Sequence, residues 1–327
     1  MDLRRFGATD LRVSEIGLGC ARIGGVFQRD PSAFLDLLSA ACDGGINFFD
    51  TADMYSQGES EVLLGRAFRG RRDQVIVATK AGYRLPAQRR LAGRLKPMLR
   101  PIVRALGLRR ESLPAAMRGE PLQDFSPAYL RKAVEGSLRR LQTDRIDLFQ
   151  LHSPDAEVVR RGEWLGALED LRRAGKIRYY GISCDTADAA LAALEHPGAC
   201  SVQIAVNLLE RATAQRVLPQ ARAAHVAVIA RESLANGLLA REVSRESLEK
   251  VCRSPQETEL RARQLAAARK LAEESACSLP QIALHFVEGL DGVSVTLVGA
   301  RTRAQLEELL RLRRSGRVPP DALRALP

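Results

Sequence analysis

The sequence predicts an α/β protein folded as a single (β/α)8 TIM barrel. Eight short apolar segments typical of buried strands recur along the 327 residues, and segments with helical periodicity lie between them. Parallel strands need helical crossovers, and eight strand–helix units close most naturally into a barrel. The length suits one barrel with insertions, so we expect one domain over residues 1–327. A doubly wound parallel sheet is the alternative that fits the same alternation.

The expected elements begin with an N-terminal β-hairpin, in which segments 3–6 and 11–13 flank a turn-rich stretch. The eight expected strands cover 15–19, 46–50, 75–80, 146–152, 177–182, 202–206, 226–230 and 293–298. The expected helices cover 31–43, 60–68, 126–141, 164–174, 186–195, 212–224, 257–275, 279–288 and 302–313. Two local signals support these bounds. Gly44-Gly45 is a typical helix stop, and Ser126 before Pro127 is a typical N-cap.

A long basic insertion interrupts the alternation after the third strand. Residues 84–125 exceed the few residues of an ordinary strand–helix connection. Positions 84–118 hold ten basic residues and one acid, so most of the net charge of +11 belongs to this segment. Its apolar residues, with Arg100 and Arg104, fit a short helix with a basic stripe. A loop after a barrel strand leaves from the catalytic mouth, where such loops set substrate choice.

Composition and spacing argue against several other classes of protein. There is no run of about 18 apolar residues and no apolar signal-peptide core, so we expect a cytoplasmic protein without a membrane span. The six cysteines form no CxxC pair and the four histidines no HExxH pattern, so we expect reduced thiols and no metal site. The basic segment lacks interleaved aromatic residues, so nucleic acid is not an expected partner. Nothing in the chain indicates an oligomeric state.

Gly17-Leu18-Gly19, at the end of the first strand, invites comparison with the dinucleotide-binding fingerprint. Arg22 stands where that fingerprint has its third glycine, and no helix begins on the glycines. A close approach of the backbone at the end of the strand is the simpler interpretation.

Three of the expected strands end in an ionisable residue. These residues are Asp50, Lys80 and His152, and Tyr55 lies in the loop after Asp50. Each alone has an ordinary structural explanation, such as a helix cap, a solvated amine or a packed ring. Neighbouring barrel strands bring their carboxyl ends to one mouth, however, so the four side chains can share a pocket.

The chemistry expected of this group is general acid catalysis on a carbonyl. A tyrosine with the ordinary pKa near 10 releases its proton poorly at neutral pH, and an adjacent ammonium lowers that pKa. A carboxylate can fix the lysine in place. A histidine can donate a hydrogen bond to a carbonyl oxygen and orient it.

Several ordered motifs make the chain resemble an aldo-keto reductase over nearly all of its length. The motifs cover 48–55 with 58–61, 78–80, 137–141 with 144–148 and 151–152, and 175–183. The resemblance implies a nicotinamide-dependent reductase on a barrel without a Rossmann fold. It also implies four catalytic roles. Tyr55 would be the proton donor, Lys80 the partner that lowers its pKa, Asp50 the anchor of Lys80, and His152 the donor to the carbonyl.

The resemblance further implies an NADP(H) cofactor, with NAD(H) less expected. Ser183 and Gln203 match positions that hold the nicotinamide carboxamide, and Cys184 stands where the family usually has asparagine. Arg231 replaces a stacking aromatic, a role that its flat guanidinium can also serve. Arg301 can meet a 2′-phosphate, which favours NADP. The other expected cofactor residues are Gly19, Leu234, Asn236, Gly237, Leu239, Gly299, Gln305 and Glu308.

The function so implied is an oxidoreductase that interconverts an aldehyde, ketone or sugar and its alcohol. The basic insertion adds the hypothesis that its arginines grip an anionic substrate, with a solvated lid as the alternative. The same family also contains NADPH-binding regulatory subunits such as the channel β-subunits. The four catalytic residues alone do not exclude that second function.

Overall fold

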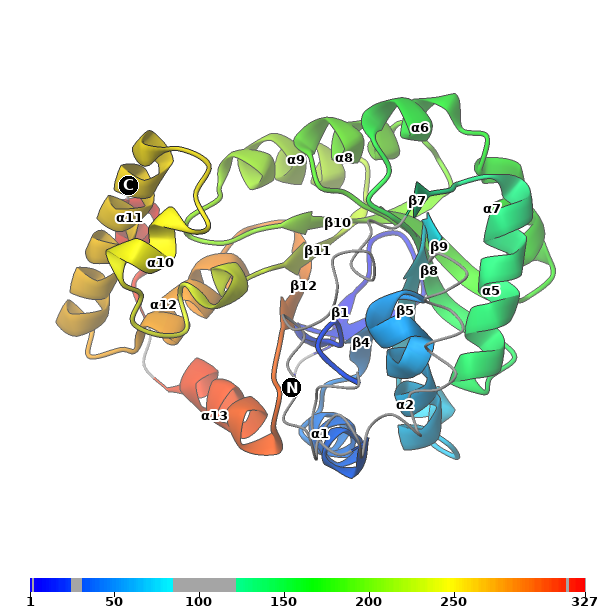
Figure 1. Ribbon diagram of the computed structural model, residues 1–327, viewed down its shortest axis with the longest axis horizontal. Coiled ribbons are helices and arrows are strands. Elements are labelled where there is room, and N and C mark those ends of the chain that lie inside the picture. Colours follow the sequence, from blue (N-terminus) through cyan, green and yellow to red (C-terminus); the bar gives the residue numbers. More distant parts are fainter. Residues whose placement is uncertain (2, 25–30, 85–121, 316–317, 327) are drawn as a thin grey trace, which may run out of the picture.

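The computed structural model describes residues 1, 3–24, 31–84, 122–315 and 318–326. Within them, eight parallel strands form a closed barrel, seen in Figure 1 as a ring of strands surrounded by helices. The strands, in barrel order from β3, are β3 (Ile16–Gly19), β4 (Phe48–Asp50), β5 (Ile76–Ala81), β8 (Ile146–His152), β9 (Ile177–Ser183), β10 (Ala199–Ala205), β11 (Ala227–Arg231) and β12 (Val293–Val298). The predicted (β/α)8 barrel is confirmed, and its closure excludes the doubly wound alternative.

The predicted helices lie outside the barrel, with bounds within a few residues of those expected. They are α1 (Pro31–Asp43), α2 (Glu59–Ala67), α5 (Pro127–Leu141), α7 (Leu165–Arg173), α8 (Ala187–Leu194), α9 (Ala212–Ala223), α11 (Pro255–Glu274), α12 (Leu279–Glu288) and α13 (Arg303–Arg314). Within the residues described, three short helices add to the expected set: α6 (Ala156–Arg161), α10 (Arg245–Glu249) and α14 (Pro320–Arg324). The Ser126 cap is present, since its side chain accepts a hydrogen bond from the Tyr129 N–H.

The N-terminal hairpin closes one end of the barrel. Its strands β1 (Leu3–Arg5) and β2 (Arg12–Ser14) pair in antiparallel fashion, as predicted. Phe6, in the turn between them, is fully buried and packs with Phe48 of β4 at 5.8 Å between ring centres. Because the hairpin fills the barrel at the N-terminal ends of the strands, a binding site can open only at the opposite end, the mouth of the barrel.

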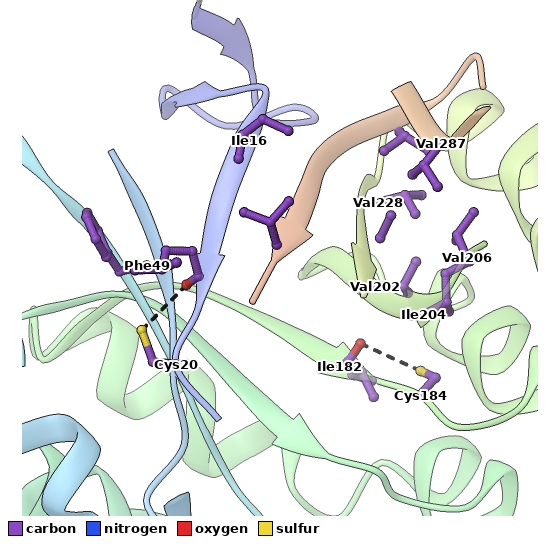
Figure 2. Packing of buried hydrophobic residues seen from close by; sticks show 14 of the residues in the cluster. Ile16, Cys20, Phe49, Ile182, Cys184, Val202, Ile204, Val206, Val228 and Val287 are labelled. Carbon is purple, nitrogen blue, oxygen red and sulfur yellow. Dashed lines mark hydrogen bonds between the residues drawn. The ribbon is translucent and has the colours of Figure 1, made fainter. Parts of the chain in front are cut away.

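Successive side chains along each strand point alternately into the barrel interior and out toward the layer of helices. On β8, Phe149 and Leu151 belong to the outer apolar core, whereas Leu148 belongs to the interior cluster with Phe6 and Phe48. Figure 2 shows part of the outer core around β10 and β11. The period of two therefore turns Gln150 and His152, like Leu148, toward the barrel axis. Both are buried there.

The base of the predicted insertion is a short two-stranded ribbon. β6 (Tyr83–Arg84) follows β5 directly and pairs with β7 (Leu122–Gln123). The expected helix with a basic stripe, including Arg100 and Arg104, lies outside the described residues. Among the helices of the described ranges, none has the length and apolar character needed to cross a bilayer.

Candidate active site

The four residues singled out from the sequence come together at the mouth of the barrel. β4, β5 and β8 are consecutive neighbours, so Asp50, Lys80 and His152 project from adjacent strands. Tyr55 begins a 3-10 turn, Tyr55–Gly58, shortly after β4. The constellation predicted from strand ends is therefore present as a spatial cluster.

The loop that carries Tyr55 is tied to β5 through its backbone. Thr51 N–H donates to the Ala78 carbonyl at 2.8 Å, and Asp53 N–H donates to the Lys80 carbonyl at 2.9 Å. These two bonds extend the ladder beyond β4 and fix the loop beside the lysine. Ser56 then adopts a φ of +50°, a conformation that turns the chain sharply after Tyr55.

Lys80 and Asp50 form a buried ion pair. Lys80 Nζ lies 2.6 Å from Asp50 Oδ2, and the two side chains are 1% and 6% exposed. The same ammonium donates to the Thr51 carbonyl at 2.9 Å. Burial acts to lower the pKa of Lys80, but attraction to Asp50 and Tyr55 outweighs it, so the pKa of Lys80 is raised. The lysine is therefore a fixed cation at neutral pH.

Tyr55 lies against this cation. Lys80 Nζ is 5.2 Å from the centre of the Tyr55 ring. Burial raises the pKa of Tyr55, and the ammonium of Lys80 acts in the opposite direction. Lys80 thus acts to lower the pKa of Tyr55, as expected. Burial is the larger effect, however, so the pKa of Tyr55 is raised overall. The phenol is accordingly protonated at neutral pH and able to donate.

His152 is a neutral imidazole packed between two aromatic rings. Tyr55 and Tyr83 make edge contacts with it, at 5.7 and 5.0 Å between ring centres. Burial, and then the positive charges of Lys80 and Arg231, lower the pKa of His152 to about 3. Its Nδ1 is buried and has no hydrogen-bond partner among the described residues. A neutral ring donates from one nitrogen only, so its tautomer decides whether it can orient a carbonyl.

The second oxygen of Asp50 is held by two amides. Gln203 Nε2 donates to Asp50 Oδ1 at 2.8 Å, and Gln150 Nε2 lies 3.4 Å from the same oxygen. Gln203 in turn accepts a hydrogen bond from the Ser183 hydroxyl at 3.1 Å. Ser183 and Gln203 thus form a buried hydroxyl–amide pair at the mouth, a donor and acceptor set that suits a carboxamide. Gln150 was missed, although its place two residues before His152 was a usable signal.

Cys184 and Arg231 occupy the rim beside this pair. The Cys184 thiol is buried and turned toward the Ile182 carbonyl at 3.6 Å, drawn as a dashed line in Figure 2. Arg231 donates to Asp185 at 2.7 Å and to the Cys184 carbonyl at 3.4 Å, and it also pairs with Glu232. The arginine is therefore fixed in place by carboxylates of two loops.

The other expected cofactor residues lie on loops at the same end of the barrel. After β11, the turn Ala235–Gly237 holds Asn236 and Gly237 at positive φ, and Leu239 is fully buried behind it. A cavity of about 930 Å³ adjoins this turn. After β12, Gly299 has open space on its Cα, as a close-lying ligand requires.

The remaining expected cofactor residues differ in how exposed they are. Arg301 is exposed, and its backbone N–H donates to Gln305 Oε1 at 2.9 Å. Glu308 is exposed on α13, and Leu234 packs partly buried against the outer core. At Gly19 a Cβ would approach the Val298 carbonyl at 3.6 Å, an ordinary contact. Among the described residues, no cluster of three His, Cys, Asp or Glu side chains could hold a metal ion.

The buried neutral state of His152 predicts a pH-dependent stability. An unfolded histidine takes up a proton near pH 6.5, whereas the folded one resists protonation down to about pH 3. At His152 the unfolded state therefore binds more protons in this window, so this group makes the protein less stable as the pH falls. The carboxyls of Asp53 and Glu288, whose pKa values burial raises to about 7, act in the opposite direction in wild type and variant alike. We therefore expect the unfolding free energy of the wild type to fall by about 2 kcal/mol relative to that of His152→Asn between pH 6.5 and 5. Urea unfolding measures it. The exposed His225→Asn is the control, and an equal slope in both variants would refute the assignment.

Comparisons with known proteins agree with this geometry. The model of the family described as "Aldo/keto reductase family" matches residues 15–323. The chain is 30% identical to the uncharacterized oxidoreductase YqkF of Bacillus subtilis, covering 100% of this chain and 95% of that protein. It is also 30% identical to a D-threo-aldose 1-dehydrogenase of a Pseudomonas species, covering 92% and 89%.

Two solved structures share the whole architecture. The holo form of aldo-keto reductase AKR11C1 from Bacillus halodurans has a TM-score of 0.78 at 28% identity, covering 100% of this chain and 96% of its own. The glycerol dehydrogenase AKR11B4 from Gluconobacter oxydans has a TM-score of 0.76 at 28% identity, covering 99% and 94%.

Proposed function

The chain belongs to the aldo/keto reductase family, and we propose that it is an NADPH-dependent oxidoreductase in which Tyr55 exchanges the proton. Family membership supports the interconversion of a carbonyl and an alcohol. The observation that carries the proposed role of Tyr55 is the buried Lys80 cation, which lies against the phenol on one side and Asp50 on the other. A buried phenol without that cation would have no stable conjugate base.

The proposed mechanism assigns the proton to Tyr55. In the direction of reduction, the phenol donates its proton to the carbonyl oxygen, and the resulting phenolate is stabilised by the ammonium of Lys80. Asp50 keeps the lysine in position through the 2.6 Å ion pair. His152, neutral at physiological pH, donates a hydrogen bond that orients the carbonyl oxygen. In the oxidative direction the same phenolate accepts the proton of the alcohol.

The residues at the mouth fit a nicotinamide cofactor. When bound, that cofactor supplies or accepts the hydride. Ser183 and Gln203 would hold its carboxamide, and the turn that contains Asn236 and Gly237 would cover its pyrophosphate. The fixed guanidinium of Arg231 would flank the nicotinamide ring. Gly299, Arg301, Gln305 and Glu308 would surround the adenosine end, as the family resemblance implies.

The substrate is proposed only by class, as a small carbonyl compound or alcohol. Relatives are named for an aldose and for glycerol, which supports a polar substrate. An anionic group on the substrate stays a prediction, because the arginines of the insertion lie outside the described residues.

Preference for NADPH over NADH is a test of the proposed role of Arg301. Truncation to Arg301→Ala should raise the KM for NADPH by about tenfold or more, since a charge-assisted hydrogen bond to phosphate is lost. The KM for NADH should stay unchanged. A screen of aldehydes, ketones and sugars with both cofactors, followed by cofactor absorbance, supplies the substrate for this measurement. Arg311→Ala is the matched control, because Arg311 is likewise exposed but lies further along, on α13.

Two outcomes of that screen would count against the proposal. If Arg301→Ala changed the KM for NADPH and the KM for NADH equally, Arg301 would not contact the 2′-phosphate. Tight binding of NADPH without turnover of any carbonyl compound would instead favour the regulatory-subunit function.

A further inference from the structure

Asp53, in the loop that carries Tyr55, is a carboxyl with few hydrogen-bond donors around it. Its Oδ1 is buried and has no hydrogen-bond partner among the described residues. Its Oδ2 lies 3.3 Å from the hydroxyl oxygen of Tyr129, a residue of α5. An ionised carboxylate has about four lone-pair sites to satisfy, so this environment suits the charged form poorly.

The hydroxyl of Tyr129 has a single hydrogen and two possible acceptors. Its oxygen lies 3.0 Å from the Tyr83 carbonyl oxygen and 3.3 Å from Asp53 Oδ2. The shorter distance favours donation to the carbonyl. The contact with Asp53 is then a hydrogen bond only if the carboxyl supplies the hydrogen. A neutral carboxylic acid therefore satisfies both contacts, whereas a carboxylate leaves one of them without a hydrogen.

The Tyr83 carbonyl depends on Tyr129 because the ribbon of β6 and β7 does not pair it. Asp124 N–H donates to the Gly82 carbonyl at 2.8 Å, and the next pair along the ribbon is Tyr83 with Gln123. Hydrogen-bonded and unbonded pairs alternate in an antiparallel ribbon, so this next pair is unbonded. The carbonyl consequently faces away from β7.

The groups packed around Asp53 also favour the neutral acid. Burial, and then the negative charge of Glu61 on α2, raise the pKa of Asp53 to about 7. Three groups oppose this shift without reversing it: Arg140, the Tyr129 hydroxyl and the Met54 N–H. The guanidinium of Arg140 is itself paired with Glu61 at 2.6 Å.

The other charged groups of the neighbouring elements are held by partners of their own. On β5, the Lys80 carbonyl accepts the Asp53 N–H, but the Lys80 ammonium is paired with Asp50. Beside the ribbon, Asp124 is paired with Arg84 at 3.2 Å. Neither pair supplies a donor to the Asp53 carboxyl.

The ribbon that receives this hydrogen bond borders the catalytic histidine. The Tyr83 ring makes its edge contact with His152 at 5.0 Å between ring centres. From β7, the Gln123 amide donates to the carbonyl of Ser153, the residue after His152, at 2.7 Å. The position of Tyr83 thus affects how firmly the imidazole is held.

We propose that Asp53 is a carboxylic acid at neutral pH whose hydrogen bond to Tyr129 completes a chain to the Tyr83 carbonyl and so holds Tyr83 against His152. Asp53 is then a positioning residue, and the inference rests on the proposed function where it treats His152 as catalytic. At higher pH the carboxyl loses its proton to solvent. The Tyr129 hydrogen then turns to the carboxylate, because the charge-assisted hydrogen bond is stronger, and the Tyr83 carbonyl loses its donor.

Carbonyl NMR of Tyr83 tests the chain without cofactor or substrate. Tyr83-Arg84 is the only Tyr-Arg pair in the sequence, so protein labelled with carbonyl-carbon-13 tyrosine and nitrogen-15 arginine gives one correlated carbonyl signal. Between about pH 5.5 and about pH 8.5, this signal should move toward the position of a carbonyl without a donor. Its midpoint should lie near pH 7.

Two variants fix the two ends of this titration. In Asp53→Asn the amide donates to Tyr129 at every pH, so the Tyr83 signal should stay at the low-pH position of the wild type. In Tyr129→Phe the signal should stay at the high-pH position. A wild-type signal that does not move, or one that moves equally in Asp53→Asn, would overturn the chain. If Asp53→Asn does not fold, the wild type and Tyr129→Phe decide.

Glu288→Gln is the matched control. Glu288 is another carboxyl whose pKa burial raises to about 7, and it is paired with Arg313 of α13 rather than with the ribbon. The Tyr83 signal of this variant should titrate as in the wild type. Loss of the titration in Glu288→Gln would assign the effect to Glu288 and refute the role of Asp53.

A kinetic readout separates this inference from the proposed function. Over the same pH range, kcat/KM of the wild type should fall by about threefold or more relative to Asp53→Asn, since one neutral hydrogen bond is lost. A constant ratio would refute the positioning role. A wild-type protein without any reductase activity would refute the proposed function, whereas the Tyr83 signal would still test the chain.

Discussion

Replacing Tyr55 with phenylalanine should lower kcat for carbonyl reduction by at least about a hundredfold, the contribution typical of a general acid. The change removes one hydroxyl and keeps the ring, so the edge contact with His152 is preserved. Binding of NADPH, followed by fluorescence titration, should stay close to that of the wild type. A large loss of kcat with intact cofactor binding places the defect in the proton transfer.

Tyr179→Phe is the matched control for this variant. Tyr179 projects from the barrel strand β9, and its hydroxyl donates to Asp10 of the N-terminal hairpin at 2.9 Å, at the closed end of the barrel. Its removal should leave kcat unchanged. If Tyr55→Phe kept more than a tenth of the wild-type kcat, another group would have to supply the proton.

The positions of these catalytic residues could be predicted because strand order controls them. An apolar run that ends in Asp50, Lys80 or His152 places that residue at the mouth of any parallel barrel, and neighbouring strands bring the three together. Tyr55 follows from its short distance to Asp50 along the chain. The Ser183–Gln203 pair was reached only through the family resemblance, because a lone serine or glutamine at a strand end has no distinctive pattern.

Other properties of the site depend on three-dimensional burial, which a sequence pattern does not measure. The net pKa of Tyr55 is raised because the pocket desolvates the phenol more than Lys80 compensates. The partners of Arg231 could not be foreseen, since Asp185 reaches it from a different loop. Gln150 could not be predicted from the ionisable residue that ends its strand, because an uncharged amide inside an apolar run carries no such signal. The short helices α6 and α10 were missed because each has too few residues for a clear helical period.

The buried ion pair between Lys80 and Asp50 should make Lys80→Met the least stable of the single variants. The substitution keeps the volume and removes the charge, so Asp50 is left as a buried carboxylate with only the amides of Gln203 and Gln150. Breaking one partner of such a pair typically costs 3–5 kcal/mol in unfolding free energy, and we expect a loss of about 3 kcal/mol or more. Urea unfolding at pH 7 measures it.

The double variant Lys80→Met/Asp50→Asn separates stability from catalysis. Neutralising Asp50 removes the uncompensated charge, so at least half of the lost stability should return, while kcat should stay as low as in Lys80→Met because the phenolate of Tyr55 still lacks its cation.

Arg140→Met is the matched control. It breaks the ion pair of the fully buried Glu61, 2.6 Å away, which lies behind the Tyr55 loop and has no proposed part in the chemistry. That variant should lose stability but keep kcat in its folded fraction.

Recovery of kcat in the double variant Lys80→Met/Asp50→Asn would mean that Lys80 serves the fold alone and that Tyr55 needs no cation to give up its proton.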